Sequence, residues 1–150
     1  MDNNNFQRIG VGSNAEAGRD FEAAAHIFFD QNGIKLSRGF PVEVGFRAKK
    51  THSFDLGSEH PPILVECKSY TWTSGGNSPS AKIRGLNEAM LLFSVAPPHY
   101  RKILFLLRHL HQRTTLSLAM HYIKNHAHLF PPSVEVWEFD LNSAQGTQLF

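Results

Sequence analysis

Residues 63–70 have the sequence ILVECKSY, which is the most informative segment of the chain. Its apolar and β-branched start predicts a mostly buried strand, in which successive side chains alternate between the two faces. Glu66 and Lys68 therefore project from the same face, and Cys67 projects from the other. Because two ionised groups in a buried strand are costly unless they are paired or bound to an ion, this strand predicts an ion pair or a functional site.

A second carboxylate precedes this strand. Asp55 lies on a short strand predicted over residues 53–57, and the turn-forming residues 58–62 separate it from residues 63–70. Asp55 can therefore lie beside Glu66. Two neighbouring carboxylates repel each other, which raises the pKa of one of them unless a cation lies between them, so the pair suggests a hard divalent metal. A lysine near that metal can hold a water molecule.

The residues before Asp55 predict a helix and a further strand. Ser13 or Asn14 can cap a helix that runs to about Asn32, with Glu16 completing a capping box and Gly33 ending it. The apolar positions of this helix repeat at three and four residues and are Ala17, Phe21, Ala24, Ala25 and Phe28.

Residues 40–47 alternate as a half-buried strand does, with Val42, Val44 and Phe46 on one face. Residues 49–51 then predict a polar turn. Together with the two strands that follow, this pattern predicts three consecutive strands joined by short turns, which is a meander.

The second half of the chain alternates helices and strands. After a Gly/Ser-rich loop over residues 73–79, Ser80 can cap a helix that ends at Pro97-Pro98. Residues 103–107 predict a strand covered on both faces, residues 116–127 a helix, and residues 134–139 an alternating strand. The expected fold class is α/β, a mixed β-sheet flanked by helices in the order α-β-β-β-α-β-α-β, with residues 1–150 forming a single domain.

Composition excludes several classes of protein. The 150 residues are 41% hydrophobic and 19% charged, which is neither a disordered nor a fibrous composition. No apolar run approaches the roughly 20 residues that span a bilayer, and the first residues do not form an export signal, so we expect no membrane. The single cysteine, Cys67, permits no intramolecular disulfide and fits a reducing compartment, so the expected location is cytoplasmic.

The charge is uneven along the chain although the net charge is only +2. Residues 1–44 carry a net −2, residues 45–128 a net +7 and residues 129–150 a net −3. A polyanion partner would therefore meet the middle segment, if folding gathers those side chains on one face. The alternative is a scattered, solvated surface.

Asp55, followed by Glu66-Cys67-Lys68 on the next strand, resembles the PD-(D/E)XK nuclease superfamily, whose fold is restriction-endonuclease-like. Gly18, Phe21-Glu22 and Gly33 look like that superfamily's opening helix, in which a glutamate points toward the site. With the element order, the resemblance covers about residues 14–107. Phe54 stands where the proline of the superfamily's name would be, a substitution such proteins commonly tolerate.

The resemblance implies a metal-dependent catalytic site. Asp55, Glu66 and the backbone carbonyl of Cys67 would ligate Mg²⁺, for which Mn²⁺ can substitute, and Glu22 would complete the site directly or through water. Lys68 would orient the attacking water and help to deprotonate it. For Glu66 and Lys68 the alternative is a structural ion pair on a strand face, and for Glu22 it is a surface glutamate beside His26.

Five residues of the middle segment are candidates for DNA binding. Lys82 and Arg84 lie in the first turns of the helix that Ser80 caps, whose N-terminal amides also favour a phosphate. Lys49 and Lys50 lie in the turn before Asp55. All four basic side chains have a solvated surface as the alternative. Tyr70 and Trp72 can stack on bases or pack in the core.

The nine histidines of the chain raise the question of a zinc site. The pairs His109-x-His111 and His126-x-His128 lack the helical spacing of a catalytic zinc site, and no second cysteine completes a structural one, so zinc is not favoured.

The sequence thus predicts a Mg²⁺-dependent DNA endonuclease, with a restriction or defence role possible. DNA, rather than RNA, depends on the resemblance alone. Cutting a duplex with so small a chain needs two copies, so we expect a homodimer. The alternatives are a junction-resolving or DNA-repair nuclease, and a non-catalytic DNA-binding subunit that retains the fold.

Overall fold

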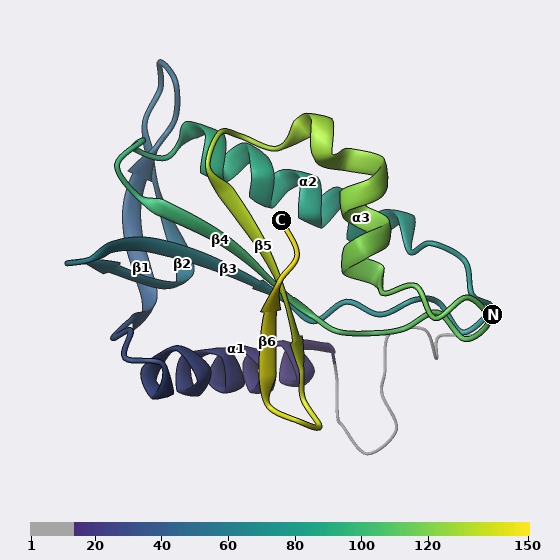
Figure 1. The fold of residues 1–150 in the computed structure, drawn as a ribbon. Helices are drawn as coiled ribbons and strands as arrows, with labels where there is room; N and C mark the ends of the chain where they lie inside the picture. Colours follow the sequence, from purple (N-terminus) through teal and green to yellow (C-terminus); the bar gives the residue numbers. More distant parts are fainter. Residues whose placement is uncertain (1–13) are drawn as a thin grey trace.

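The computed structural model describes residues 14–150, which form a six-stranded mixed sheet with helices on both faces (Figure 1). The strands are β1 (Ser37–Val44), β2 (Lys50–Glu59), β3 (Pro62–Lys68), β4 (Arg101–Leu107), β5 (Val134–Asp140) and β6 (Gln145–Gln148). The helices are α1 (Asn14–Gln31), α2 (Ser80–Val95) and α3 (Leu118–His126), with a short 3-10 helix, η2 (Ala127–Leu129). No helix among these residues has the length and apolar character to cross a membrane. The predicted cap Ser13 lies outside the described residues.

The spatial order of the strands is the same as their order in the chain. β1, β2 and β3 pair antiparallel, which confirms the predicted meander, and β3, β4 and β5 pair parallel. The element order α-β-β-β-α-β-α-β is confirmed, and β6 adds an antiparallel edge strand that was not predicted. Its residues are mostly exposed, so no apolar alternation marks it in the sequence.

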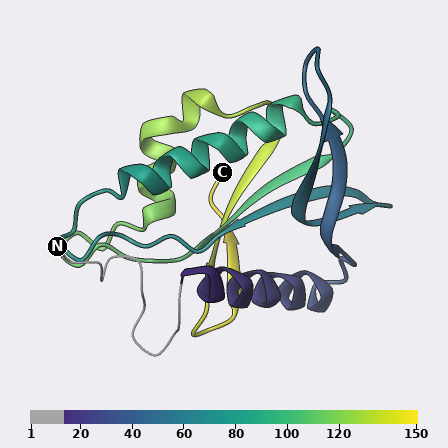
Figure 2. The ribbon, with the colours of Figure 1, turned by 180° about the vertical axis from the view of Figure 1, so that it is seen from behind.

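Helix α1 covers one face of the sheet, and α2 and α3 cover the other (Figures 1 and 2). Ala17, Phe21, Ala25 and Phe29 are the buried positions of α1, at the four-residue spacing of one helical face. Phe21 stacks on Phe105 of β4, with ring centroids 5.9 Å apart. On the opposite face, the buried residues of α2 pack on the sheet with α3; they are Ile83, Leu86, Ala89, Met90 and Phe93.

Strand β4 is the apolar centre of the sheet. From Lys102 to Leu107 every residue is buried, as predicted for a strand covered on both sides. It pairs with β3 in a register that sets Glu66 opposite Leu104 and Lys68 opposite Leu106. The charged side chains of β3 therefore have an apolar strand on one side, and their polar partners lie on the other.

The predicted strand over residues 40–47 is wrong at its end. β1 begins at Ser37 and stops at Val44, and Gly45 turns the chain with φ +132°. Phe46 therefore lies outside the strand and is 74% exposed, instead of continuing the buried row of Val42 and Val44. Lys50 is the first residue of β2, so the turn spans residues 45–49.

Ser80 was predicted to cap α2, and this prediction is also wrong. Pro79 holds the cap position and Ser80 is the first helical residue. The carbonyl of Pro79 accepts hydrogen bonds from the N–H groups of Lys82, at 2.9 Å, and Ile83, at 3.0 Å. Proline suits a position just before a helix because its fixed φ and missing N–H leave no backbone donor without a partner.

Candidate active site

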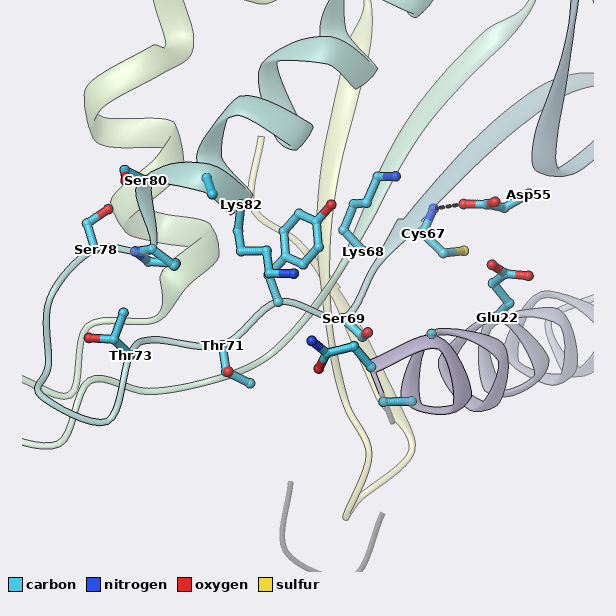
Figure 3. A pocket seen from close by; sticks show the side chains of 16 residues that line it. Glu22, Asp55, Cys67, Lys68, Ser69, Thr71, Thr73, Ser78, Ser80 and Lys82 are labelled. Carbon is cyan, nitrogen blue, oxygen red and sulfur yellow. Dashed lines mark hydrogen bonds between the residues drawn. The ribbon is translucent and has the colours of Figure 1, made fainter. Parts of the chain in front are cut away.

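Strands β2 and β3 part at the point where the predicted catalytic residues lie. Their ladder runs from Glu59 opposite Pro62 to Leu56 opposite Val65, and there it stops. In place of the next backbone pair, Asp55 Oδ2 accepts a hydrogen bond of 2.7 Å from the backbone N–H of Cys67 (Figure 3). The side chain of Asp55 thus satisfies a donor of β3 that the separation of the strands would otherwise leave unpaired.

The carboxylate of Glu66 is only 4% exposed and has two partners. Its Oε1 lies 2.9 Å from His52 Nε2, and its Oε2 lies 3.6 Å from Lys68 Nζ. Because an ionised carboxylate only accepts hydrogen bonds, the Nε2 atom of His52 carries a proton and donates it. The structure therefore places Glu66 and Lys68 on one face, as predicted, and supplies the pairing that a buried charge requires.

The carboxylates of the site destabilise each other's charge. Burial, and then the negative charge of Glu66, raise the pKa of Asp55 to about 6. Burial raises the pKa of Glu22 as well, and the charge of Asp55 adds to this effect. A cation bound among these oxygens would relieve the repulsion and lower both pKa values.

Lys68 is positively charged in this setting. Burial alone would lower its pKa, but Tyr70, Glu66 and Asp55 together outweigh burial and raise the pKa above its ordinary value. Lys68 therefore acts as a hydrogen-bond donor and a fixed positive charge. Lys68 was also predicted to help deprotonate water, which requires a neutral amine. The raised pKa disfavours that neutral form.

Glu22 reaches the site from α1. Figure 3 shows its carboxylate rising from the helix toward Asp55 and Cys67. Its Oε2 also lies 3.5 Å from the guanidinium of Arg38, which lies on β1. The thiol of Cys67 is buried among the apolar residues on the α1 side, and burial raises its pKa well above the ordinary value. Cys67 thus contributes apolar packing through its side chain and not a thiolate nucleophile.

A cavity of about 400 Å³ opens beside these groups. It lies between the start of α1, the end of β3 and the start of α2, and Glu22, Asp55, Cys67 and Lys68 line it (Figure 3). Its remaining wall is mostly polar or small and includes Ser69, Tyr70, Thr71, Thr73, Ser78, Ser80 and Lys82. Glu66 does not line the cavity; it lies behind, where it holds Lys68 and His52.

The predicted DNA-binding residues divide into two groups. Lys82 and Ser80 line the cavity, and Lys82 Nζ lies 5.2 Å from the centre of the Tyr70 ring. Arg84 is exposed on α2 outside the cavity, and Lys49 and Lys50 are exposed on the hairpin between β1 and β2. Of these five residues, only Lys82 and Ser80 line the same cavity as Glu22, Asp55 and Lys68.

The aromatic and histidine candidates mostly hold loops together. Trp72 is buried, and its backbone N–H donates to His109 Nδ1 at 3.1 Å. His111 Nε2 lies 2.9 Å from the carbonyl of Gly76 and its ring packs against Trp72. His26 Nε2 bonds to the carbonyl of Leu36. Trp72 therefore packs and does not stack on a ligand, whereas Tyr70 faces the cavity.

The sequence analysis did not predict two residues of the site, His52 and Arg38. His52 contacts the carboxylate of Glu66, and Arg38 contacts that of Glu22. The predicted turn ended at Thr51 and the predicted second strand started at Ser53, so His52 was assigned to neither, whereas β2 begins at Lys50. Extending the alternation back to Lys50 would have placed His52 on the same face as Phe54, whose ring packs 4.6 Å from the imidazole. For Arg38 the sequence offers no signal, because its contact depends on how α1 crosses β1.

The oxygen donors of the site fit Mg²⁺. Among residues 14–150, no three His, Cys, Asp or Glu side chains form a ready-made metal site. Mg²⁺ does not require one, because proteins usually hold it with one or two carboxylates, and water and substrate phosphates supply the other ligands. Burial is the first cause of the raised pKa values of Asp55 and Glu22 and a neighbouring carboxylate is the second, and a divalent cation bound beside them would lower both pKa values.

Comparisons of this chain with protein-family models, with curated proteins and with solved structures found no match. The functional interpretation therefore depends on the residues and the geometry described above.

Proposed function

We propose that this protein is a Mg²⁺-dependent DNA endonuclease of the PD-(D/E)XK type with a restriction-endonuclease-like fold. The observation that carries the proposal is the convergence of Asp55, Glu66 and Lys68 where β2 and β3 part, beside a polar cavity. A structural ion pair alone explains Glu66 and Lys68. It does not explain why a second carboxylate, that of Asp55, is buried beside them at the cost of a raised pKa.

The element order supports the same proposal. The resemblance rests on an opening helix, three strands, a second helix and a further strand, and α1 through β4 have this order. Gly33, with φ +78°, ends α1, and Glu22 faces the cavity. The departure at Phe54 removes no reactive group, because its ring is buried against Phe93 of α2.

The resemblance implies that Asp55, Glu66 and the carbonyl of Cys67 would hold Mg²⁺, with Glu22 as a direct or water-bridged partner. Asp55, Glu22 and Cys67 line the cavity, whereas both oxygens of Glu66 already contact His52 and Lys68, so Glu66 would have to exchange one of these partners for the ion. An ion bound there would acidify a water molecule and neutralise charge that develops on a phosphodiester. Lys68 donates hydrogen bonds into the cavity and holds a positive charge beside the reacting phosphate. Glu66 and His52 fix the position of that ammonium group.

The substrate side of the cavity has donors for a DNA backbone. Lys82 and the hydroxyl groups of Thr73, Ser78 and Ser80 line the wall opposite Glu22. Half to two-thirds of protein–DNA hydrogen bonds go to phosphate and sugar, from side chains of this kind. A homodimer, in which each copy cuts one strand, would account for cleavage of a duplex by so small a chain.

The test is a cleavage assay with supercoiled, linear, single-stranded and branched DNA, in Mg²⁺ and in chelator. We expect cleavage in Mg²⁺ alone and no cleavage by Asp55→Asn. Asp30→Asn, which changes an exposed carboxylate on α1, is the matched control and should remain active. Mg²⁺ should also raise the melting temperature of the wild type and not that of Asp55→Asn. Full activity of Asp55→Asn, or activity in chelator, would overturn the proposed site.

A further inference from the structure

The hairpin between β1 and β2 extends beyond the rest of the molecule on the side of the sheet that α2 covers, next to the end of that helix (Figures 1 and 2). Its turn comprises residues 45–49, which we call the hairpin tip. At 74%, Phe46 has the largest exposed fraction of any large apolar side chain among residues 14–150. A single exposed apolar residue is ordinary on a protein surface, so its meaning depends on what surrounds it.

The hairpin tip is held in one shape. Gly45 has φ +132°, and a Cβ atom there would lie 2.0 Å from the carbonyl oxygen of Ala48, so only glycine fits. The ammonium of Lys49 donates to the carbonyl of Gly45 at 2.6 Å. The N–H of Gly45 donates to the carbonyl of Val95 at 3.0 Å, which fixes the base of the tip to α2. Phe46 is therefore presented by an ordered turn.

The charge around Phe46 is mainly positive. Arg47, Lys49 and Lys50 are all exposed, and the one acidic residue at the base of the hairpin tip is the exposed Glu43, opposite Thr51. An apolar wedge flanked by cations is the arrangement with which proteins enter the minor groove, partly unstack a base step and hold the adjacent phosphates. An anionic membrane surface also attracts an aromatic residue flanked by cations, and DNA is favoured here because it is the substrate of the proposed active site on the same strand.

The hairpin tip is continuous with the candidate active site through β2. Lys50 and His52 project from the same face of the strand, and His52 contacts Glu66. From Lys50 to Asp55 the strand covers about 16 Å. Phe46 lies two residues beyond Val44, the partner of Lys50, and can therefore be up to about 7 Å further from Asp55. Along B-DNA these lengths correspond to about five to seven base pairs.

We propose that Phe46 is a wedge that inserts between base pairs of duplex DNA, about five to seven base pairs from the phosphate in the active site. Arg47 and Lys50 hold the flanking phosphates. This inference rests on the proposed function, because it takes DNA as the substrate of that site. It adds a point of contact outside the cavity, and it predicts that the bound DNA is distorted at a fixed distance from the cut.

A fluorescence experiment tests the wedge without cleavage. Duplexes carry 2-aminopurine, which brightens when it unstacks, at successive positions, and they are bound to the full chain in chelator. The wild type should brighten the reporter at one or two neighbouring positions. Phe46→Ala should lose that signal and bind about tenfold more weakly, whereas Phe46→Trp should keep it. Leu141→Ala, which changes a 48% exposed residue in the β5–β6 turn, is the matched control.

Equal affinity and equal brightening for the wild type and Phe46→Ala would overturn the wedge. So would a Phe46→Ala protein that binds DNA normally but loses self-association in sedimentation, because Phe46 would then contact a second copy of the chain. Cleavage in Mg²⁺ is measured in parallel. A wild type that cuts DNA without brightening any reporter overturns the wedge alone, and one that brightens a reporter but never cuts overturns the proposed nuclease alone.

Discussion

Strand β3 has two neighbours that differ in almost every respect. On the β4 side the ladder is unbroken from Ile63 to Lys68, and the partners of Glu66 and Lys68 are leucines. On the β2 side the ladder stops at Val65, and the groups beyond it are Asp55 and His52. The β4 side of β3, which we call the apolar side, is packed against apolar residues. The β2 side, which we call the open side, faces polar groups and a cavity.

The difference shows how a buried strand can carry reactive charges. Where two strands separate, each loses backbone partners, so side chains such as Asp55 must satisfy the exposed donors. The cavity beside Lys68 opens where the strands separate. The unbroken β4 side holds the strand rigid while this happens, which keeps the charges within a small range of positions.

Removing the charge on the open side should have the largest effect. Lys68→Ala should lower the cleavage rate by about two orders of magnitude or more, because it removes the donor and charge beside the reacting phosphate. Affinity for DNA and for Mg²⁺ should change little. Lys35→Ala, which removes an exposed lysine on the surface, is the matched control. A Lys68→Ala enzyme with a near wild-type rate would show that this lysine is only structural.

A substitution on the apolar side should lower the free energy of unfolding and not the cleavage rate. Leu104 is fully buried opposite Glu66, so Leu104→Ala leaves a cavity and should cost about 2–5 kcal/mol of unfolding free energy in a urea titration. At temperatures where the variant is still folded, its cleavage rate should remain close to that of the wild type. A large loss of rate in fully folded Leu104→Ala would mean that the two sides of β3 are not separable.

The two sides also differ in how well the sequence predicts them. The apolar run of β4 and the alternation of Glu66, Cys67 and Lys68 are local patterns, so both strands and their faces follow from the sequence alone. The hydrogen bond between Asp55 and the N–H of Cys67 depends on where β2 leaves β3, and His52 was not predicted to lie on a strand. Strand β6 escaped prediction because tertiary contacts define it: Gly146 leaves room for the ring of Phe28, which a Cβ would approach within 2.6 Å.

The pH dependence of the unfolding free energy should reveal how much the ionised carboxylate of Asp55 on the open side destabilises the fold. The pKa of Asp55 is about 6 in the folded protein and 3.8 as the reference value, so between these values the folded state holds a proton that the unfolded chain has released. Stability from this group is therefore present at low pH, falls as pH rises from about 4 to 6, and stays lower by about 2–3 kcal/mol above that range.

Asp55→Asn isolates this effect. Urea unfolding of both proteins from pH 4 to pH 8 should give a difference that grows in favour of the variant and levels off above about pH 6. The amide oxygen of asparagine can still accept the hydrogen bond from Cys67, so the comparison keeps that contact. A difference that is flat across the range would mean that Asp55 has an ordinary pKa and is not crowded by Glu66.

The smallest expected effect belongs to His52, the contact on the open side that the sequence did not predict. His52→Ala leaves Glu66 Oε1 buried without its donor, which should cost about 1–3 kcal/mol of stability. Because Glu66 also holds Lys68, the cleavage rate should fall, but by less than in Lys68→Ala. His52→Gln can still donate from its amide and should recover part of both losses, as read from urea unfolding and single-turnover cleavage. If the alanine variant matches the wild type in both measurements, the orientation of Glu66 is set by Lys68 and the strand alone.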